Sequence, residues 1–418
     1  MKKYVFICLT SEGYGGAQLY INYKERFLES LGFSTYIVSC CAEKGKPNIN
    51  HDISSIIIKK IAINPKLLTR ISQKRIINKI RRFISYSLED EIIIESLSFP
   101  FALWGELIAS NLNCKSIIYS ISESNKINSS ILPFVEFKTQ RGEVACIDPR
   151  FIYGLYEKSL VVNPGMVLKL EAYIGDVTLD YSPEVLNKIV YREKNILVFG
   201  RLEKQYVIEA AREISLFCSR IADHSFSVLF IGDSPNRQSK KRIEAYFERL
   251  PNVSLIMLGG INPVPRSLFK RFDVIIAGSG CASTSFRNGG VTIAMDVKDN
   301  GLPLGLMGYD TVSTFKRDNP GYVRLTLQEL LMKLLFENYA EGKIVMDPIP
   351  LAPSESFVSH MDFVSNSCSS KQFFEINKMK VDRIDYLRAF LVLVLGNRNK
   401  ADSFQIALKR LFNREKNK

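Results

Sequence analysis

The 418-residue chain has few of the side chains on which several kinds of site chemistry depend. It contains three histidines and one tryptophan, and its eight cysteines form no Cys-x-x-Cys pair and follow no regular spacing. Zinc sites and disulfide frameworks both need such spacing, so neither is expected. We expect the cysteines to be small buried hydrophobic residues in a reducing compartment.

A long hydrophobic run is also missing. The longest one after the first predicted strand, Ala389–Leu395, is far below the roughly 20 residues that a membrane-spanning helix needs. The amino-terminal run, Tyr4–Leu9, is short for a signal peptide and continues directly into a glycine-rich turn. The sequence therefore predicts a cytoplasmic protein.

Positive charge is in excess: the net charge is +13 and the isoelectric point is about 9.2. This balance favours anionic partners such as nucleotides or phospholipid head groups, although a coding bias toward lysine would give the same excess. Nucleic acid is not an expected partner, because the chain has no recognition motif for it. With 46% hydrophobic and 24% charged residues, the length fits two globular domains of about 150–200 residues.

The first forty residues predict a strand, a turn, a helix and a second strand. The turn contains Gly15 and Gly16, the helix covers Ala17–Leu31, and the second strand covers Phe33–Ser39. Bare glycines at a helix N-terminus let an anion approach free N–H groups. The pattern is not a dinucleotide fingerprint, because Gln18 stands where the third glycine would be. A tight turn without a ligand is the alternative.

Apolar runs and helical stretches alternate through the first 180 residues, which predicts a parallel sheet. One helix, Pro65–Leu88, has an apolar stripe flanked by Lys and Arg. It could lie on an anionic bilayer, or it could be an ordinary domain helix with a solvated charged face. The polar stretch 181–193 predicts an interdomain linker.

The second half repeats the alternation and opens on the strand Ile196–Phe199 and the turn Gly200-Arg201-Leu202-Glu203-Lys204. A buried strand that ends in a basic, glycine-containing turn places positive charge at the carboxyl edge of an α/β sheet, where ligands bind. Gly232 ends a later strand in the same way. A loop rich in glycine, serine and threonine, Gly278–Gly290, then precedes the apolar run Val291–Met295. Such a loop suits phosphate oxygens, and a surface loop without a ligand is the alternative.

These features together resemble the GT-B glycosyltransferases, and among them the retaining, family-4-type enzymes of bacterial surface polysaccharide synthesis, such as capsule and lipopolysaccharide. Gly15-Gly16-Ala17-Gln18 before a helix looks like that family's first-domain turn. Phe199-Gly200-Arg201-Leu202 with nearby Lys204 looks like the opening of its second domain. Later strands also look similar, and these are Val228–Gly232, Asn252–Leu255 and Phe272–Ile276. The resemblance covers nearly the whole chain.

The resemblance implies an α/β protein with two doubly wound Rossmann-like domains facing across a cleft, and a helical C-terminal extension. We expect an acceptor domain at 1–180, a linker at 181–193, a nucleotide-sugar domain at 194–345, and a crossover with a helical basic tail at 346–418. The implied activity is hexosyl transfer from a nucleotide sugar to a membrane-linked oligosaccharide or polysaccharide. No cofactor besides the donor substrate is expected, and the lack of an Asp-x-Asp pair agrees with metal-independent chemistry.

Particular residues receive roles from the same resemblance. Arg201 and Lys204 would neutralise the donor diphosphate as the sugar leaves. Glu123 stands near the place of the family's first-domain histidine and is a candidate catalytic acid. Backbone groups at two first-domain and five second-domain positions would contact donor or acceptor, and these are Gly15, Gly16, Gly200, Gly232, Gly290, Val291 and Thr292.

The sequence departs from the family at its acids. The family has two glutamates eight positions apart in the donor loop and the following helix. Aligning Ala294-Met295 with the family's Ala-Met pair puts Ser285 and Ile293 at those places. Asp310 is a further acid to consider. The missing pair leaves a second hypothesis open, a catalytically weakened GT-B-like protein that binds a partner in a polysaccharide assembly complex.

Two stretches near the C-terminus favour contact with a surface. Phe390–Leu395 is an apolar run inside a helix that begins near Val381, which favours burial against the protein, a partner or the bilayer. Ala401–Lys418 is expected to form a second basic amphipathic helix. Two such helices in a chain of this charge favour peripheral binding to the inner membrane surface.

Overall fold

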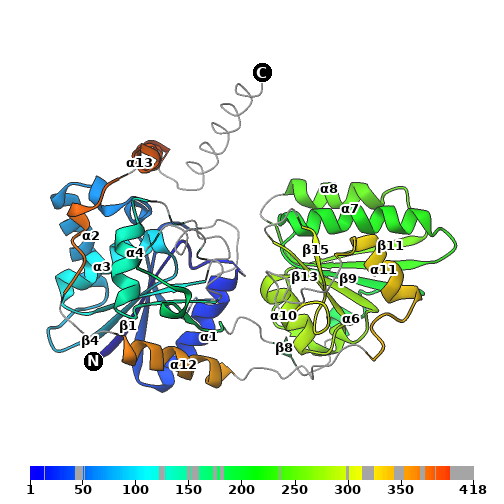
Figure 1. Cartoon of the computed structure of the whole chain (residues 1–418), viewed down its shortest axis with the longest axis horizontal. Helices are drawn as coiled ribbons and strands as arrows, with labels where there is room; N and C mark the ends of the chain where they lie inside the picture. The colour runs from blue at the N-terminus through cyan, green and yellow to red at the C-terminus, as the bar shows by residue number, and fades with distance from the viewer. Residues whose placement is uncertain are drawn as a thin grey trace. The chain divides into compact units, whose positions relative to one another are not determined.

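The structure, a computed structural model, consists of two units, each with its own core (Figure 1). The first unit is Met1–Ile174 with Leu351–Lys418, and the second is Gly175–Pro350. The residues that the structure describes are 1–13, 15–42, 50, 52–121, 127, 129–147, 152, 159, 161–172, 177–178, 183–234, 237–297, 301–312, 324–342, 353–367, 372–381 and 383–395. Glu123 and the basic helix predicted at 401–418 lie outside these residues.

The first unit is built on a seven-stranded parallel sheet with the order β3-β2-β1-β4-β5-β6-β7. Its strands are β1 (Lys2–Cys8), β2 (Phe33–Ser39), β3 (Ser54–Ile57), β4 (Glu91–Ser96), β5 (Lys115–Ser120), β6 (Val144–Cys146) and β7 (Leu168–Lys169). Its helices are α1 (Gly16–Ser30), α2 (Arg70–Phe83), α3 (Phe99–Leu112), α4 (Leu132–Gln140), α12 (Pro353–Asn366) and α13 (Arg383–Leu395), with short 3-10 turns η1 (Lys59–Ala62), η2 (Pro65–Leu67), η4 (Pro164–Met166) and η5 (Ile376–Lys378).

Alternating residues of β1 show how the first core is layered. Tyr4 and Phe6 pack against α1 and α12, whereas Val5 and Ile7 pack against α2 and α3 on the other face. Burial on both faces is the reason that parallel strands appear as continuous apolar runs. The predicted β-turn-α-β unit at the amino terminus is therefore present.

The second unit is built on a six-stranded sheet with the order β11-β10-β9-β13-β14-β15, in which β15 is antiparallel. Its strands are β9 (Lys194–Phe199), β10 (Phe226–Ile231), β11 (Val253–Gly259), β13 (Val274–Gly278), β14 (Thr292–Met295) and β15 (Pro303–Leu306), and β8 (Val177–Thr178) pairs separately with β12 (Val264–Pro265). Its helices are α6 (Pro183–Leu186), α7 (Gln205–Arg220), α8 (Arg237–Phe247), α9 (Arg266–Phe269), α10 (Ser279–Arg287) and α11 (Leu327–Phe336).

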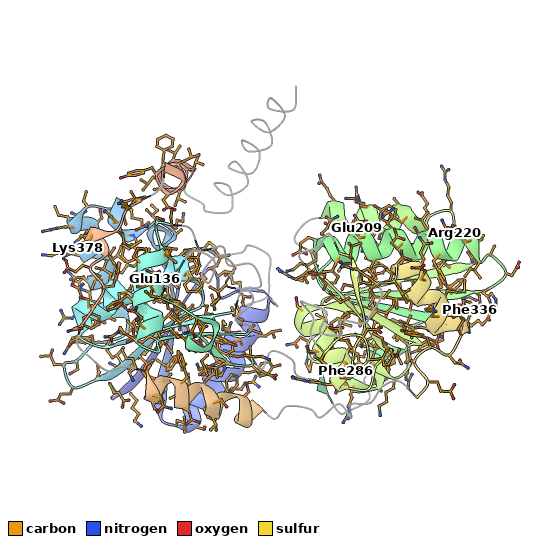
Figure 2. All side chains as sticks on the ribbon, in the orientation of Figure 1. Glu136, Glu209, Arg220, Phe286, Phe336 and Lys378 are labelled. Carbon is orange, nitrogen blue, oxygen red and sulfur yellow. The ribbon has the colours of Figure 1, made fainter. Side chains whose placement is uncertain are left out.

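The same alternation layers the second core, as the side chains in Figure 2 fill both sides of the sheet. Ile196 and Val198 of β9 pack with α7, α8 and α11, and Leu197 packs with residues of α6, α9 and α10. The predicted linker 181–193 contains α6, whose Leu186 is buried in this core. Both sheets thus have a doubly wound strand order, with three strands on one side of a central reversal.

Two predicted elements differ from the structure. The basic helix predicted at Pro65–Leu88 is divided, because the side chains of Asn64 and Thr69 each cap a separate start, at η2 and α2. The loop predicted at Gly278–Gly290 is largely helix α10, in which Ser285 is fully buried. Serine, threonine and glycine have low helix propensity, so packing against the sheet overrides the local preference.

The C-terminal segment is fastened to the first unit by polar side chains. The Lys115 ammonium donates to the carbonyls of Val364 and Ser367, at 2.6 and 3.2 Å. The Glu106 carboxylate accepts from the backbone N–H of Phe374 at 2.8 Å, and the Lys66 ammonium donates to the carbonyl of Met379.

A fully buried ionic network lies beneath α12. Glu95 of β4 accepts hydrogen bonds from Lys24 at 2.5 Å and Tyr20 at 2.8 Å, and also from Tyr4. Tyr20 also contacts Nδ1 of His360 on α12 at 3.1 Å. Burial lowers the pKa of His360 to about 3, so its ring is neutral at pH 7. Burial acts to raise the pKa of Glu95, but the charge of Lys24, together with the hydrogen bonds that Lys24 and Tyr4 donate, holds that pKa below its usual range.

Candidate functional site

Both sheets have a glycine-containing turn beside a topological switch point. The strand order reverses between β1 and β4 in the first unit and between β9 and β13 in the second. Ligands of open α/β sheets bind outside the carboxyl ends of the strands at such points. The turn after β1 contains Gly15 and Gly16, and the turn after β9 contains Gly200, Arg201 and Lys204.

The turn after β9 is held against the turn after β10. The N–H of Gly200 donates to the Ile231 carbonyl at 2.9 Å, and the N–H of Leu202 donates to the Asp233 carbonyl at 3.2 Å. A Cβ on Gly232 would overlap the carbonyl of Gly200, so a side chain there would push the two turns apart. The structure therefore brings Gly200 and Gly232 together.

Tyr206, in the first turn of α7, is buried at this edge of the sheet. A Cβ on Gly200 would overlap its hydroxyl, and a Cβ on Gly278 would lie 3.1 Å from its ring. At Gly301, a Cβ would lie 2.6 Å from the Tyr206 Cα. The glycines at the ends of β9 and β13 thus let the backbone pack closely around the Tyr206 ring. The sequence did not indicate this role of Tyr206.

Arg201 and Lys204 bring positive charge to the same turn. The Arg201 side chain is 46% exposed, and its guanidinium lies 3.3 Å from the Glu203 carboxylate. Lys204 is half-buried and immediately precedes α7, whose first turn has no acidic residue. The positive end of the helix dipole adds to the two cations, so the turn can bind an anion such as a diphosphate.

The second helix to begin at this switch point is α10. It follows Gly278, the last residue of β13, and it too has no acidic residue in its first turn and no side-chain hydrogen bond at its N-cap. The sequence pattern did not reveal this helix, because its first turns consist of small residues. The only signal in the sequence was the spacing of three positions between Ala282 and Ser285, both of which are buried in α10.

The structure separates Gly290, Val291 and Thr292 from this edge. β14 runs parallel to β13 and begins at Thr292, so the three residues lie toward the amino edge of the sheet, away from Gly200 and Gly232. The N–H of Gly290 donates to the Ser285 carbonyl at 3.0 Å, and the Thr292 hydroxyl donates to the Gly290 carbonyl at 2.9 Å. Because these groups bond within the unit, we leave the three residues out of the phosphate site.

The alignment of Ala294-Met295 with a helical Ala-Met pair also needs correction. Both residues lie on strand β14, and the helix that follows β13 is α10, earlier in the chain. The places assigned to the family's two glutamates therefore fall on buried Ser285 in α10 and buried Ile293 in β14.

In the first unit, Gly15 precedes α1 and Gly16 begins it. Neutral amides brace this turn: the Gln18 side chain donates to the Thr10 carbonyl at 2.9 Å, and the Asn50 side chain donates to the Ser11 carbonyl at 3.0 Å. A Cβ on Gly15 would overlap the Gln18 side-chain oxygen. The glycines are thus placed as predicted from the sequence, but no basic residue lies between Thr10 and Gln18.

The acid Asp310 has a structural position. It is fully buried, and its carboxylate accepts the backbone N–H of Leu306 at 2.7 Å and the Tyr339 hydroxyl at 3.4 Å. A carboxylate that closes the turn after β15 in this way is not presented to a substrate. In the part of the chain that the structure describes, no group of three His, Cys, Asp or Glu side chains could hold a metal ion.

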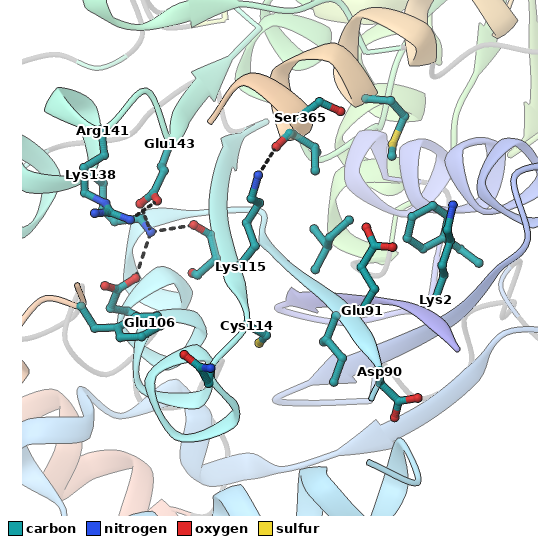
Figure 3. A pocket seen from close by; sticks show the side chains of 18 of the residues that line it. Lys2, Asp90, Glu91, Glu106, Cys114, Lys115, Lys138, Arg141, Glu143 and Ser365 are labelled. Atoms are coloured by element: carbon teal, nitrogen blue, oxygen red, sulfur yellow. Dashed lines mark hydrogen bonds and ion pairs between the residues drawn. The ribbon is translucent and has the colours of Figure 1, made fainter. Parts of the chain in front are cut away.

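A cavity of about 500 Å³ lies at the other end of the first sheet (Figure 3). It is lined at the starts of β1, β4 and β5 by Lys2, Glu91 and Lys115. Its inner charges are paired, since Lys138 lies 2.9 Å from Glu106 and 2.5 Å from Glu143. This amino edge is opposite the ligand-binding edge of an α/β sheet, and its charges support the C-terminal segment, so we do not assign the active site here.

The fold class also emerges from comparison with solved structures. A glycosyltransferase from Rickettsia africae superposes with a TM-score of 0.56 at 14% identity, over 88% of this chain and 94% of that one. HepE from Anabaena, solved with UDP and glucose, gives 0.53 at 12% identity, over 90% and 97%. MnaA from S. aureus, solved with UDP, gives 0.50 at 13% identity, over 89% and 99%.

At these identities the likeness concerns the fold. The chain has the two Rossmann-like domains of a GT-B protein, followed by C-terminal helices, which confirms the predicted fold class. No protein-family model and no curated protein matches the sequence. Among the helices that the structure describes, none is long and apolar enough to cross a bilayer.

Proposed function

We propose that the chain is a glycosyltransferase that moves a hexose from a nucleotide sugar to a membrane-linked oligosaccharide or polysaccharide. The observation that supports this most is the pair of cations, Arg201 and Lys204, at the switch-point turn of the second sheet. UDP is the first nucleotide to test, because HepE and MnaA were both solved with it.

The proposed chemistry is electrostatic. As the bond between sugar and phosphate breaks, negative charge develops on the departing diphosphate, and cations already in place stabilise it without reorganising. Arg201 would contact the diphosphate, and Lys204 at the start of α7 would add charge beside the helix dipole. Gly200 and Gly232 would let the phosphates approach the backbone, and the turn at Gly15 and Gly16 would receive the acceptor. This reaction would need no metal ion.

Glu203 gives the proposal a specific test. Its carboxylate lies 3.3 Å from the Arg201 guanidinium, so an arriving diphosphate competes with it for the same cation. Glu203→Gln should therefore tighten UDP binding a few-fold, whereas Arg201→Ala should weaken it by about tenfold or more, since a charged hydrogen bond contributes about 1.5–3 kcal/mol.

The experiment is a panel of nucleotide sugars, with thermal stabilisation and donor hydrolysis as readouts. Transferase activity predicts a shift with at least one donor, slow donor hydrolysis, and loss of both in Arg201→Ala. If no donor shifts the melting temperature and Arg201→Ala behaves like the wild type, the transferase proposal is wrong.

A second function is a catalytically weakened GT-B-like protein that binds a partner in a polysaccharide assembly complex. The absence of Asp and Glu from α10, the helix that follows β13, favours it. This function predicts donor binding without hydrolysis or transfer. Turnover of any donor at a rate that depends on Arg201 would exclude it.

A further inference from the structure

Helix α13 presents an apolar stripe to solvent on the outside of the first unit (Figure 1). Tyr386, Phe390, Leu393 and Val394 are 58%, 61%, 56% and 63% exposed. Their spacing of four, seven and eight residues puts them on one face of the helix, and half-exposed Leu387 extends that face. Single exposed apolar residues are ordinary, but five on one helical face form a contiguous patch that indicates a partner.

The opposite face of α13 packs against the first unit, so the apolar stripe faces solvent. Ala389, Leu391 and Val392 are buried against Ile63, with Leu67 and others packed around them. Near the start of the helix, the Ser130 hydroxyl donates to Asp385 at 3.4 Å. Figure 2 accordingly shows side chains on the side of α13 that faces away from the unit. The stripe is therefore separate from the face through which α13 packs onto the core of the first unit.

Exposed cations lie on the segments directly before and after the residues that α13 contacts, Ala62–Leu68. Lys59 and Lys60 lie on η1, within four residues of Ile63, and both are exposed. Arg70 and Lys74, at the start of α2, are also exposed, and Ile71 between them is 65% exposed. From residue 53 to residue 88 the sequence contains nine Lys and Arg and no Asp or Glu.

We propose that this surface of the first unit, the α13 stripe with Lys59, Lys60, Arg70 and Lys74, binds an anionic lipid bilayer. The stripe would enter the boundary between head groups and acyl chains while the cations contact anionic head groups. A second copy of the chain would bring two basic surfaces together, whereas an anionic bilayer complements both the charge and the apolar face. The inference goes beyond the proposed function, because lipid binding is measured without donor or acceptor.

The test is co-sedimentation of the full chain with vesicles of phosphatidylglycerol and phosphatidylcholine, or of phosphatidylcholine alone. The expected result is binding to the anionic vesicles that weakens at high salt. The double variant Phe390→Ser/Leu393→Ser should lower that binding at least about tenfold, because two exposed apolar side chains no longer enter the bilayer. Val358→Ser, at a 49% exposed position on α12, is the matched control and should bind like the wild type.

A second pair of variants tests the charge. Lys59→Glu/Lys60→Glu should lower binding at least about thirtyfold, since each of the two lost cations contributes about 1 kcal/mol near the surface. Lys240→Glu/Lys241→Glu on α8 makes the same change in net charge on the second unit and should have a much smaller effect. Unchanged thermal unfolding and unchanged UDP binding in all variants separate this result from misfolding and from failure of the proposed function.

Three outcomes would overturn the proposal. One is absence of wild-type binding to anionic vesicles, and another is undiminished binding of the double serine variant. The third is a wild-type protein that is a dimer in light scattering and does not bind vesicles, together with a Phe390→Ser/Leu393→Ser variant that is a monomer. The stripe would then be a contact between two copies of the chain.

Discussion

The two units share a strand order but use charged side chains in different ways. In the first unit, Lys24 pairs with Glu95, and Lys138 pairs with Glu106 and Glu143, all within the interior. In the described part of the second unit, the ion pairs have partly exposed side chains, and one of them includes Arg201 at the switch-point turn.

This difference separates structural charge from charge that is available to a ligand. A buried and fully bonded pair holds elements together and is closed to ligands. A half-exposed arginine whose carboxylate neighbour is also partly exposed can exchange that neighbour for a phosphate. The first unit's switch-point turn contains no Lys or Arg between Thr10 and Gln18 and is braced by amides, so we propose the turn of the second unit, rather than this one, for the anionic donor.

The largest expected effect is the loss of one buried charge in the first unit. Lys24→Met leaves Glu95 without its cation and should lower the free energy of unfolding by about 3–5 kcal/mol, measured by urea denaturation. The double variant Lys24→Met/Glu95→Leu should recover part of that loss, because no unpaired charge remains. Equal stability of Lys24→Met and the wild type would mean that the pair does not hold α1 to the sheet.

His360 predicts a pH dependence of the first unit. Burial lowers the pKa of His360 to about 3 in the folded protein. As the pH falls below about 6.5, this histidine therefore takes up a proton in the unfolded chain but not in the folded one. Stability should therefore decrease by about 2 kcal/mol between pH 6.5 and pH 5, at roughly 1.4 kcal/mol per pH unit. Lys24 and Glu95 also face this ring: burial lowers the pKa of Lys24, and the pKa of Glu95 is held below its usual range.

His360→Gln should flatten the slope of unfolding free energy against pH, measured by denaturation at several pH values. His224→Gln is the control, since His224 is 36% exposed in the second unit. A slope that stays the same in His360→Gln and disappears in His224→Gln would contradict this account.

A smaller effect is expected at the packed turns of the second unit. Gly232→Ala adds a Cβ that overlaps the Gly200 carbonyl, and moving the two turns apart should cost about 1–2 kcal/mol of stability and weaken UDP binding. Gly165→Ala is the control, because the nearest atom to its Cβ would be at an ordinary 3.4 Å. Calorimetry and UDP titration of both variants measure the difference, and equal behaviour would refute the packing argument.

The smallest effect belongs to the exposed ion pairs of the second unit. Lys240 and Glu244 lie 3.9 Å apart on α8 with side chains 53% and 45% exposed. Lys240→Ala should change the free energy of unfolding by less than about 0.5 kcal/mol, because solvent screens the pair. If Lys240→Ala lowered the free energy of unfolding as much as Lys24→Met, the exposed pairs of the second unit would contribute as much stability as the buried pairs of the first, which contradicts this account.

The sequence revealed those parts of the fold that depend on local pattern. Apolar runs followed by glycine-containing turns predicted β1, β9 and their turns, because both properties are encoded within a few residues. The ionic network was not predictable, since Lys24 and Glu95 are 71 positions apart and each alone resembles a surface residue. The clue was a glutamate inside the buried run of β4.

The site was predictable only in part, for a similar reason. Gly200, Arg201 and Lys204 follow one strand, so their proximity is local. Gly290, Val291 and Thr292 were assigned to the site on the assumption that the residues before them form a loop. Those residues form helix α10 instead, in which Ala282 and Ser285 are buried. Glu123 lies outside the described residues and stays a prediction.

The central claim is that the turn after β9 binds the diphosphate of a nucleotide-sugar donor. The most direct measurement is isothermal titration of UDP into the wild type, Arg201→Ala and Arg220→Ala. The two variants lose the same charge, but Arg220 ends α7 whereas Arg201 precedes it. We expect Arg201→Ala to weaken binding by about tenfold or more and Arg220→Ala to leave it unchanged. Equal affinity in all three proteins would contradict the account.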